Sequence, residues 1–294
     1  MRARIGITLG DAAGIGPEVV RAALDSSRLP TSADYVVIGD YPRCSLGQPT
    51  PKTARAASAA LEEAVALAKC RKLDGVVTGP IHKARMYKIG FEFPGQTEFF
   101  ANRCGAANFA MLLTGGALSV ALVTTHIPLA DVPRVLSTSE IVRVGLLMEQ
   151  FLRQRGIGKP RMAVAGLNPH AGESGALGRE DLDIIAPAVT QLQHACAKAV
   201  VDGPFSPDTI FYDAANGRWD GVLCMYHDQG LIPLKLHAFH EGVNVTLGLP
   251  FPRTSPDHGT AFAIAGKGIA RADSMIAAIT LAVTLANKTA GNPT

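Results

Sequence analysis

Short apolar runs alternate along this chain with longer stretches of helical period, and this alternation limits the fold more than any other feature. Such alternation is typical of α/β proteins with a largely parallel sheet. We expect strands over residues 5–9, 35–38, 75–78, 110–114, 119–125, 162–166, 222–225 and 243–247. We expect helices over residues 53–72, 139–155, 179–197 and 273–287, with further helices opening at Gly16-Pro17 and at Gly79-Pro80.

One pair of these runs departs from the parallel arrangement. Only a short segment containing Gly115-Gly116 separates the run at 110–114 from the run at 119–125. Two strands joined by so tight a turn lie antiparallel. We therefore expect one antiparallel element inside a mostly parallel sheet.

Size and charge exclude several classes of protein. The chain has 294 residues, 47% of them hydrophobic, which is enough for one large α/β unit or two lobes. Its net charge is +3, with Lys and Arg spread along the chain, so we expect no nucleic-acid partner.

The five cysteines are scattered without a CxxC pair, which indicates a reducing compartment rather than a disulfide framework. The start of the chain lacks an apolar signal core, and the apolar stretch 275–286 is too short to cross a bilayer, so we expect a cytoplasmic protein without membrane contact.

Three histidines occupy equivalent positions at the ends of apolar runs. His126 closes VALVTTH, His170 closes MAVAGLNPH and His227 closes VLCMYH. If these runs are parallel strands of one sheet, the imidazoles emerge at its C-terminal edge, where open α/β sheets bind ligands. One such histidine is usually a packing or hydrogen-bonding residue. Three in matching positions predict a site for a divalent transition metal such as zinc.

Two further segments are candidates for anion binding. The glycine-rich turn at 10–18 joins a strand to a helix, where backbone N–H groups can hold a phosphate, although a purely structural turn is an equal alternative. Downstream of His227, the donors Lys235, Asn244 and Arg253 suit phosphate or carboxylate, although solvated surface charge is the better explanation for any one of them taken alone. Arg253 is the exception, because we expect it in an apolar loop, where a lone cation needs a partner.

A string near the end of the chain points to a nicotinamide cofactor. Residues 257–261 read DHGTA and residues 265–270 read AGKGIA. This pattern resembles a segment of isopropylmalate and isocitrate dehydrogenases, in which a His-Gly turn meets the adenosine half of the cofactor. The resemblance implies that His258 and Gly259 bind NAD or NADP. A structural glycine-rich loop is the alternative.

Motifs spread over nearly the whole chain resemble one family. In order they read GDAAGIGPE, TGPIHK, GQTEFF, TTHIPL, GLNPHAGE, MYHDQG and GVNVTLGLPFPRTSPDHGTA, followed by the AGKG string. They resemble the 4-hydroxythreonine-4-phosphate dehydrogenase family of pyridoxine biosynthesis. The resemblance implies an isocitrate/isopropylmalate dehydrogenase-like α/β fold, with two interleaved α/β lobes around a mixed, mostly parallel sheet and an interlobe cleft. It also implies a homodimer with a shared active site.

The resemblance assigns roles to individual residues. It implies that one divalent metal per site (zinc, magnesium, cobalt or manganese) is held by the family's metal-binding histidines, which correspond to His126, His170 and His227. The family's substrate-binding residues correspond to Thr97, Lys235, Asn244 and Arg253. Asp208 matches an acidic residue near the metal. Asp208, Lys235 and a metal-bound water remain alternatives for the general base.

The chain departs from the family pattern in three places. Gln96 stands where the family has a histidine that contacts the substrate. Ala12 replaces a proline in the first glycine-rich turn, and the segment between Asp40 and Thr53 is shorter than usual. The change at Gln96 bears on the choice of substrate, and the other two bear mainly on shape.

The implied reaction is metal-dependent, NAD- or NADP-linked oxidation of a small phosphorylated hydroxy acid, followed by decarboxylation. The family substrate is 4-phosphooxy-L-threonine, which gives 3-amino-2-oxopropyl phosphate. Two alternatives within the class are a phosphorylated four-carbon sugar acid, such as 4-phospho-threonate or 4-phospho-erythronate, and a carboxylated aromatic cis-dihydrodiol. A metal-binding relative without redox chemistry is a remote alternative.

Overall fold

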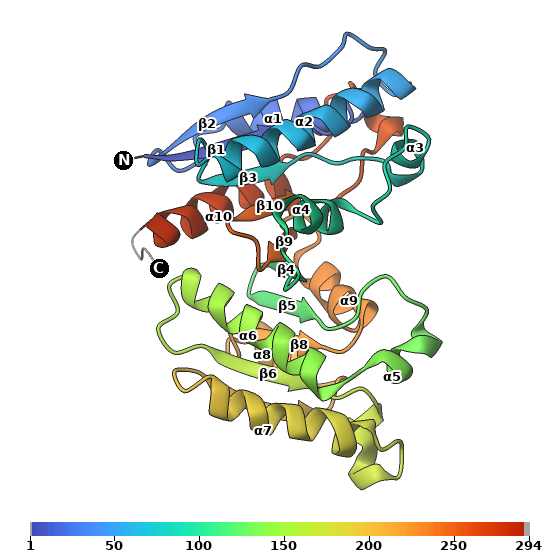
Figure 1. The fold of residues 1–294 in the computed structure, drawn as a ribbon, viewed down its shortest axis with the longest axis vertical. Helices are drawn as coiled ribbons and strands as arrows, with labels where there is room; N and C mark the ends of the chain where they lie inside the picture. Colours follow the sequence, from blue (N-terminus) through green and yellow to red (C-terminus); the bar gives the residue numbers. More distant parts are fainter. Residues whose placement is uncertain (1, 291–294) are drawn as a thin grey trace. The chain divides into compact units, whose positions relative to one another are not determined.

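The computed structural model describes residues 2–290 of the chain. The chain divides into two compact units, which we describe separately (Figure 1). The first unit combines the chain up to Ala107 with the chain from Val243 onward. The second unit is the continuous segment Asn108–Gly242. Both units have the α/β character that the sequence predicts.

The first unit has five strands in the order β2-β1-β3-β10-β9. These strands are β1 (Ala3–Thr8), β2 (Ala33–Ile38), β3 (Gly75–Thr78), β9 (Val243–Leu247) and β10 (Arg253–Pro256). β1 is parallel to both β2 and β3, and β10 is parallel to β3, whereas β9 runs antiparallel to β10. The helices are α1 (Gly16–Leu24), α2 (Pro51–Lys69), α3 (Lys83–Tyr87), α4 (Gln96–Cys104), α10 (Asp273–Ala290) and the short 3-10 helix η4 (Phe262–Ile264).

Local sequence explains the long helix α2. Pro51 occupies its first position, and Thr50 and Thr53 form a capping box in which each hydroxyl accepts a hydrogen bond from the other residue's backbone N–H, at 3.3 and 3.1 Å. Its alanine-rich face is buried and packs against β1, β2 and β3. α10 packs against β1, β3, β9 and β10.

The second unit has five strands in the order β4-β5-β8-β6-β7. These strands are β4 (Ala110–Gly115), β5 (Leu118–Leu122), β6 (Arg161–Ala165), β7 (Val200–Phe205) and β8 (Gly221–Cys224). β4 and β5 form the expected antiparallel pair, while β5, β8, β6 and β7 are mutually parallel. The helices are α5 (Val132–Val135), α6 (Thr138–Gln154), α7 (Ala186–Ala195), α8 (Ile210–Ala215) and α9 (His227–Ala238). Short helices complete the unit: the 3-10 helices η1 (Leu129–Asp131) and η2 (Pro169–Gly175) and the π-helix η3 (Asp181–Ile185).

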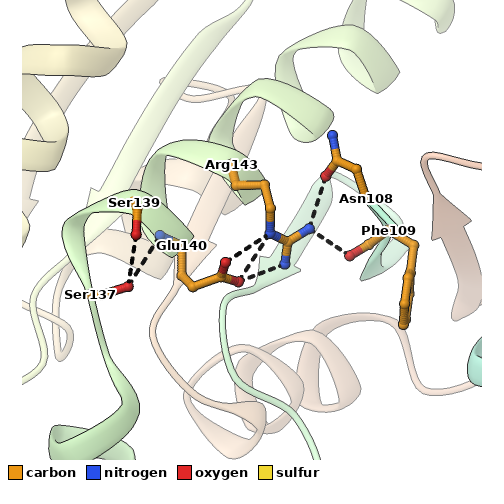
Figure 2. A network of polar contacts seen from close by, with 6 residues as sticks. All are labelled: Asn108, Phe109, Ser137, Ser139, Glu140 and Arg143. Atoms are coloured by element: carbon orange, nitrogen blue, oxygen red, sulfur yellow. Dashed lines mark hydrogen bonds and ion pairs between the residues drawn. The ribbon is translucent and has the colours of Figure 1, made fainter. Parts of the chain in front are cut away.

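The start of α6 is anchored to the segment that precedes β4 (Figure 2). Ser137 caps the helix by accepting a hydrogen bond from the Glu140 backbone N–H at 3.3 Å. Arg143 pairs with Glu140 at 2.8 Å and also donates to the side-chain oxygen of Asn108 and to the carbonyl of Phe109. The guanidinium therefore joins a helix turn to the strand entry and fixes where α6 lies on the sheet.

The mostly parallel α/β fold is confirmed, and three details of the sequence prediction are wrong. No helix starts at Gly79-Pro80, because Gly79 extends β3 by donating its N–H to the carbonyl of Thr8, and α3 begins only at Lys83. The helix expected over 179–197 begins as the π-helix η3 and ends at Ala195. Arg253 lies in the buried strand β10 rather than in a loop. Within residues 2–290, no helix combines the length and the apolar character needed to cross a membrane.

Candidate active site

The three histidines follow the ends of three adjacent parallel strands in the second unit. β8 pairs in parallel with β5 on one side and with β6 on the other. His126 follows β5, His227 follows β8 and His170 follows β6. The register that the sequence predicts for these strands is therefore confirmed. Asp208 follows β7, the next strand along, so the same edge of the sheet also carries a carboxylate.

His126 and His227 lie together. Their ring centroids are 5.6 Å apart, with the rings tilted by 45°. His227 is the first residue of α9, and its Nδ1 lies 2.7 Å from Oδ1 of Asp228. A carboxylate partner on one ring nitrogen fixes the tautomer and leaves the other nitrogen to act as a metal ligand. His227 is thus oriented by its own neighbour in the sequence.

His170 lies near Asp208 instead. The pKa of the Asp208 carboxyl is lowered, first by the hydrogen bond from the Ser206 hydroxyl at 2.5 Å and to a smaller extent by the charge of His170. Asp208 therefore stays ionised at neutral pH. His170 and Asp208 thus place an imidazole and a negative charge at the ends of β6 and β7, on the same edge of the sheet.

The donors suit a divalent metal, although they do not converge on one point. In the described part of the chain, no group of three or more His, Cys, Asp or Glu side chains is gathered closely enough to hold a metal ion. Three imidazoles and a nearby carboxylate at one sheet edge are nevertheless the ligands that zinc and related ions prefer. Metal binding by His126, His170 and His227 remains a prediction.

A buried amide joins the strand ends that carry these histidines. Gln229 is 6% exposed, accepts a hydrogen bond from the Met225 N–H and donates one to the Gly166 carbonyl, both at 2.6 Å. Thr124 donates its hydroxyl to the Met225 carbonyl at 2.8 Å. The ends of β5, β8 and β6 are therefore linked through Met225 and Gln229, which no local sequence signal reveals.

Arg253 is the central cation of the first unit. It is 2% exposed, and its guanidinium donates to the hydroxyls of Thr78 and Thr246 and to the side-chain oxygen of Gln96. Its guanidinium carbon lies 5.3 Å from the centroid of the Phe100 ring. Burial lowers the pKa of Arg253 to about 9, against a smaller raising effect of the Glu98 charge, so the group is a cation at neutral pH.

Gln96 contacts that cation directly, and Thr97 lies beside one of its partners. Gln96 and Thr97 open α4: Gln96 donates to the Gly79 carbonyl at 3.1 Å, and the Thr97 hydroxyl lies 3.3 Å from that of Thr246. The Oδ1 atom of Asn244, in β9, and the Nε atom of Arg253 are buried and have no hydrogen-bond partner. A bound ligand or an ordered water can satisfy buried polar atoms in this state. Lys235, by contrast, is a half-buried residue of α9 in the second unit.

Thr78, Thr246 and Phe100 belong to the surroundings of Arg253, and the sequence analysis missed all three. Each occupies an ordinary apolar or β-branched position within a predicted strand or aromatic segment. Only the pairing of β3, β9 and β10 places Thr78 and Thr246 beside the guanidinium. No pattern in the sequence distinguishes them from core residues.

The predicted cofactor segment has an open glycine. A Cβ atom on Gly259 would meet nothing within 4 Å, so packing does not require glycine there. Gly14 in the glycine-rich turn differs, because a Cβ atom would lie 2.6 Å from the carbonyl of Thr260. That turn is thus held closely against the segment that follows His258, and the hydrogen bond from Ile15 N–H to the Thr260 carbonyl, at 2.9 Å, fastens it there.

Known proteins resemble this chain along nearly its whole length. The model of a family described as "Pyridoxal phosphate biosynthetic protein PdxA" matches residues 15–282. A 4-hydroxythreonine-4-phosphate dehydrogenase of Caulobacter vibrioides is 48% identical over 95% of this chain and 88% of its own length. The crystal structure of a 4-hydroxythreonine-4-phosphate dehydrogenase from Klebsiella pneumoniae is similar with a TM-score of 0.81 at 36% identity, covering 97% of this chain and 99% of that one. A terephthalate 1,2-cis-dihydrodiol dehydrogenase from Burkholderia xenovorans is similar with a TM-score of 0.70 at 28% identity, covering 97% and 98% of the two chains.

Proposed function

The chain belongs to the family of the pyridoxal phosphate biosynthetic protein PdxA, and from this premise we propose that it oxidises and decarboxylates 4-phosphooxy-L-threonine to 3-amino-2-oxopropyl phosphate. It is an oxidoreductase of the dehydrogenase class. The observation that carries the proposal is the position of His126, His227 and His170 after three adjacent parallel strands. This is the part of an α/β sheet where ligands bind.

We propose that Arg253 and its neighbours hold the anionic ends of the substrate. A buried guanidinium can bind a phosphate or carboxylate through two parallel hydrogen bonds. Thr97 adds a hydroxyl 3.3 Å from that of Thr246, which accepts a hydrogen bond from Arg253, and Asn244 adds a buried amide oxygen in β9. The family resemblance also assigns Lys235, in α9, to substrate binding.

The histidine group would hold one divalent metal: zinc, magnesium, cobalt or manganese. When bound, such an ion supplies Lewis-acid chemistry that lowers the pKa of the substrate hydroxyl. The chain's own contribution is orientation, because Asp228 fixes the ring of His227 and Gln229 joins the ends of β8 and β6. Asp208, ionised beside His170, is a candidate to accept the hydroxyl proton, and Lys235 is the alternative.

We propose NAD or NADP as the hydride acceptor, positioned by His258 and Gly259. The open space at Gly259 leaves room for a ligand to approach the backbone of this turn. Oxidation of the secondary alcohol places a ketone next to the carbon that carries the carboxylate. The resulting β-keto acid loses carbon dioxide, which accounts for both halves of the reaction.

A carboxylated aromatic cis-dihydrodiol is the second candidate substrate. Two observations favour it: the similarity to the terephthalate dihydrodiol dehydrogenase, and Gln96 in place of a substrate-contacting histidine. In this chain both ends of the Gln96 amide are engaged, by Arg253 and by the Gly79 carbonyl. A neutral amide beside the buried cation suits a carboxylate, whereas a protonated histidine would add charge for a phosphate.

Assays of both substrates with NAD and with NADP test the function, with Gln96→His as the diagnostic variant. If 4-phosphooxy-L-threonine is the substrate, the variant should keep or raise kcat/KM for it, because a charged hydrogen bond of about 1.5–3 kcal/mol replaces a neutral one of about 1 kcal/mol. If the dihydrodiol is the substrate, the variant should lower kcat/KM for the dihydrodiol. Metal-dependent turnover of neither substrate by the unmodified enzyme would contradict the proposal.

We further propose that the protein is a homodimer whose active site draws on both chains. α9 and its C-cap residue support this, because they carry three exposed apolar residues on successive turns: Ile232 at 66%, Leu236 at 88% and Phe239 at 69% exposure. Leu231, Leu234 and Ala238 of the same segment are buried, so the helix is apolar on two sides. Exposed apolar groups of this kind mark interaction surfaces.

Sedimentation should show a dimer at assay concentrations, and Leu236→Glu should shift it toward monomer. Leu146→Glu is the matched control, since Leu146 is an exposed leucine of α6 at 41% exposure. Mixing His126→Ala chains with Lys235→Ala chains should restore part of the activity if the two residues meet across subunits. A fully active monomer would contradict the proposed homodimer with a shared active site.

A further inference from the structure

The segment that carries His170 has an unusual backbone. Six consecutive residues, from His170 to Gly175, have positive φ angles of 53, 50, 81, 42, 55 and 93°. Four of them are not glycine, and left-handed conformations are disfavoured for such residues. Runs of such residues persist only where the surrounding structure holds them in place. The turn therefore needs an external support.

Asp181 provides that support. It is fully buried, and its Oδ1 accepts a hydrogen bond from the Leu167 N–H at 2.8 Å. Its Oδ2 accepts from the backbone N–H of Asn168 at 3.1 Å and from the Asn168 side-chain amide at 2.9 Å. All three donors belong to the residues that lead from β6 into the left-handed turn.

The carboxylate is also closely enclosed by glycines on both sides of the turn. A Cβ atom on Gly166 would lie 2.7 Å from Oδ1 of Asp181, and one on Gly172 would lie 3.2 Å from Oδ2. The chain thus has glycine at both places where a side chain would displace the carboxylate. The chain that enters the turn at Gly166 and the middle of the turn at Gly172 therefore both pack closely against the Asp181 carboxylate.

We propose that Asp181 is a positioning residue that fixes the backbone of the turn carrying His170, and so sets where its imidazole lies as one of the three proposed metal ligands, with His126 and His227. This inference rests on the proposed function, in which these histidines bind the metal. Asp181 acts mainly through the backbone, because it accepts hydrogen bonds from residues 167 and 168 and so fixes the path of the chain into the turn. Without the three hydrogen bonds that Asp181 accepts, the turn relaxes toward ordinary negative φ angles. The imidazole of His170 then leaves the position from which it would bind the metal.

The test compares Asp181→Asn with Asp183→Asn. Asn keeps the size of Asp181 but presents an NH₂ group to a backbone donor, so at least one hydrogen bond is lost. Asp183 is two residues away, is 51% exposed and pairs with Arg179, which makes it a matched control for loss of one charge. Asn168→Ala is a milder second variant that removes a single donor to Asp181.

Two measurements are made on folded, metal-free protein. Amide hydrogen exchange of the 167–176 peptide reports on the turn directly. Titration with cobalt(II) alone, followed by its visible absorption, reports on the ligand geometry. We expect Asp181→Asn to speed exchange in this peptide and to weaken cobalt binding roughly 10–100-fold, as is usual for groups that orient metal ligands. Asp183→Asn should match the wild type, and activity lost by Asp181→Asn at low cobalt should return at high cobalt.

Unchanged exchange and unchanged cobalt affinity in Asp181→Asn would overturn the inference. If that variant does not fold, Asn168→Ala decides in the same way, with a smaller effect in the same direction expected. If the wild type itself binds no cobalt, the proposed metal site fails rather than the role of Asp181 in the turn. In that case, amide hydrogen exchange of the 167–176 peptide is the single measurement that tests whether Asp181 supports the turn.

Discussion

Arg253→Met is expected to lower kcat/KM for the phosphorylated substrate by roughly 10²–10⁴-fold, because it removes two charge-assisted hydrogen bonds worth about 1.5–3 kcal/mol each. The guanidinium is 2% exposed and is already oriented by Thr78, Gln96 and Thr246 before any ligand binds. Such preorganisation reduces the entropy lost on binding and gives the group its large effect. Steady-state kinetics on the purified variant measure this fall in kcat/KM.

The same substitution should change stability far less than activity. Replacing a buried ionic group by an apolar side chain of similar length is often neutral or stabilising, because the cost of desolvating the charge disappears. We expect the free energy of unfolding to change by less than about 2 kcal/mol. Arg103→Met is the matched control, since Arg103 is an arginine of α4 in the same unit that is 39% exposed and pairs with Glu62 at the surface. A kcat/KM for Arg253→Met within threefold of the wild type would exclude this residue from substrate binding.

His170→Ala is expected to nearly abolish metal binding and to lower kcat by roughly 1000-fold or more, since Lewis-acid stabilisation of the reacting oxygen contributes several kcal/mol. The fold should survive, because the His170 side chain is exposed and supports no core contact. Metal content and activity are measured on the same folded sample. His194→Ala, an exposed histidine of α7, is the control.

The backbone at His170 calls for one additional variant. Alanine is strained at a φ of 53°, at a cost of about 1–2 kcal/mol, whereas asparagine tolerates this conformation well. His170→Asn thus removes the imidazole with little change in the turn. Full metal occupancy with a normal rate in both variants would show that His170 is not a ligand.

The sequence by itself determined the α/β class, the antiparallel β4–β5 pair and the position of the three histidines at one sheet edge. These features follow from local patterns. Apolar runs mark the strands, the Gly115-Gly116 turn sets the direction of its neighbours, and a residue that follows a strand must emerge at that strand's end. Motifs along the whole chain also identified the family, which the comparisons confirm.

Only the tertiary structure decided what surrounds these residues. β10 reads RTSP, a polar string with a terminal proline that carries no strand signal, yet it is buried between β3 and β9. The partners of Arg253 lie far away in the chain: Gln96 is 157 residues distant and Thr78 is 175. Asp181 holds the residues that lead into the turn at His170 through backbone donors, and Gln229 joins two strand ends through backbone groups as well. Contacts that depend on strand order and on backbone groups leave no trace in residue type or spacing, so the sequence predicted the ligands but not the side chains that hold them.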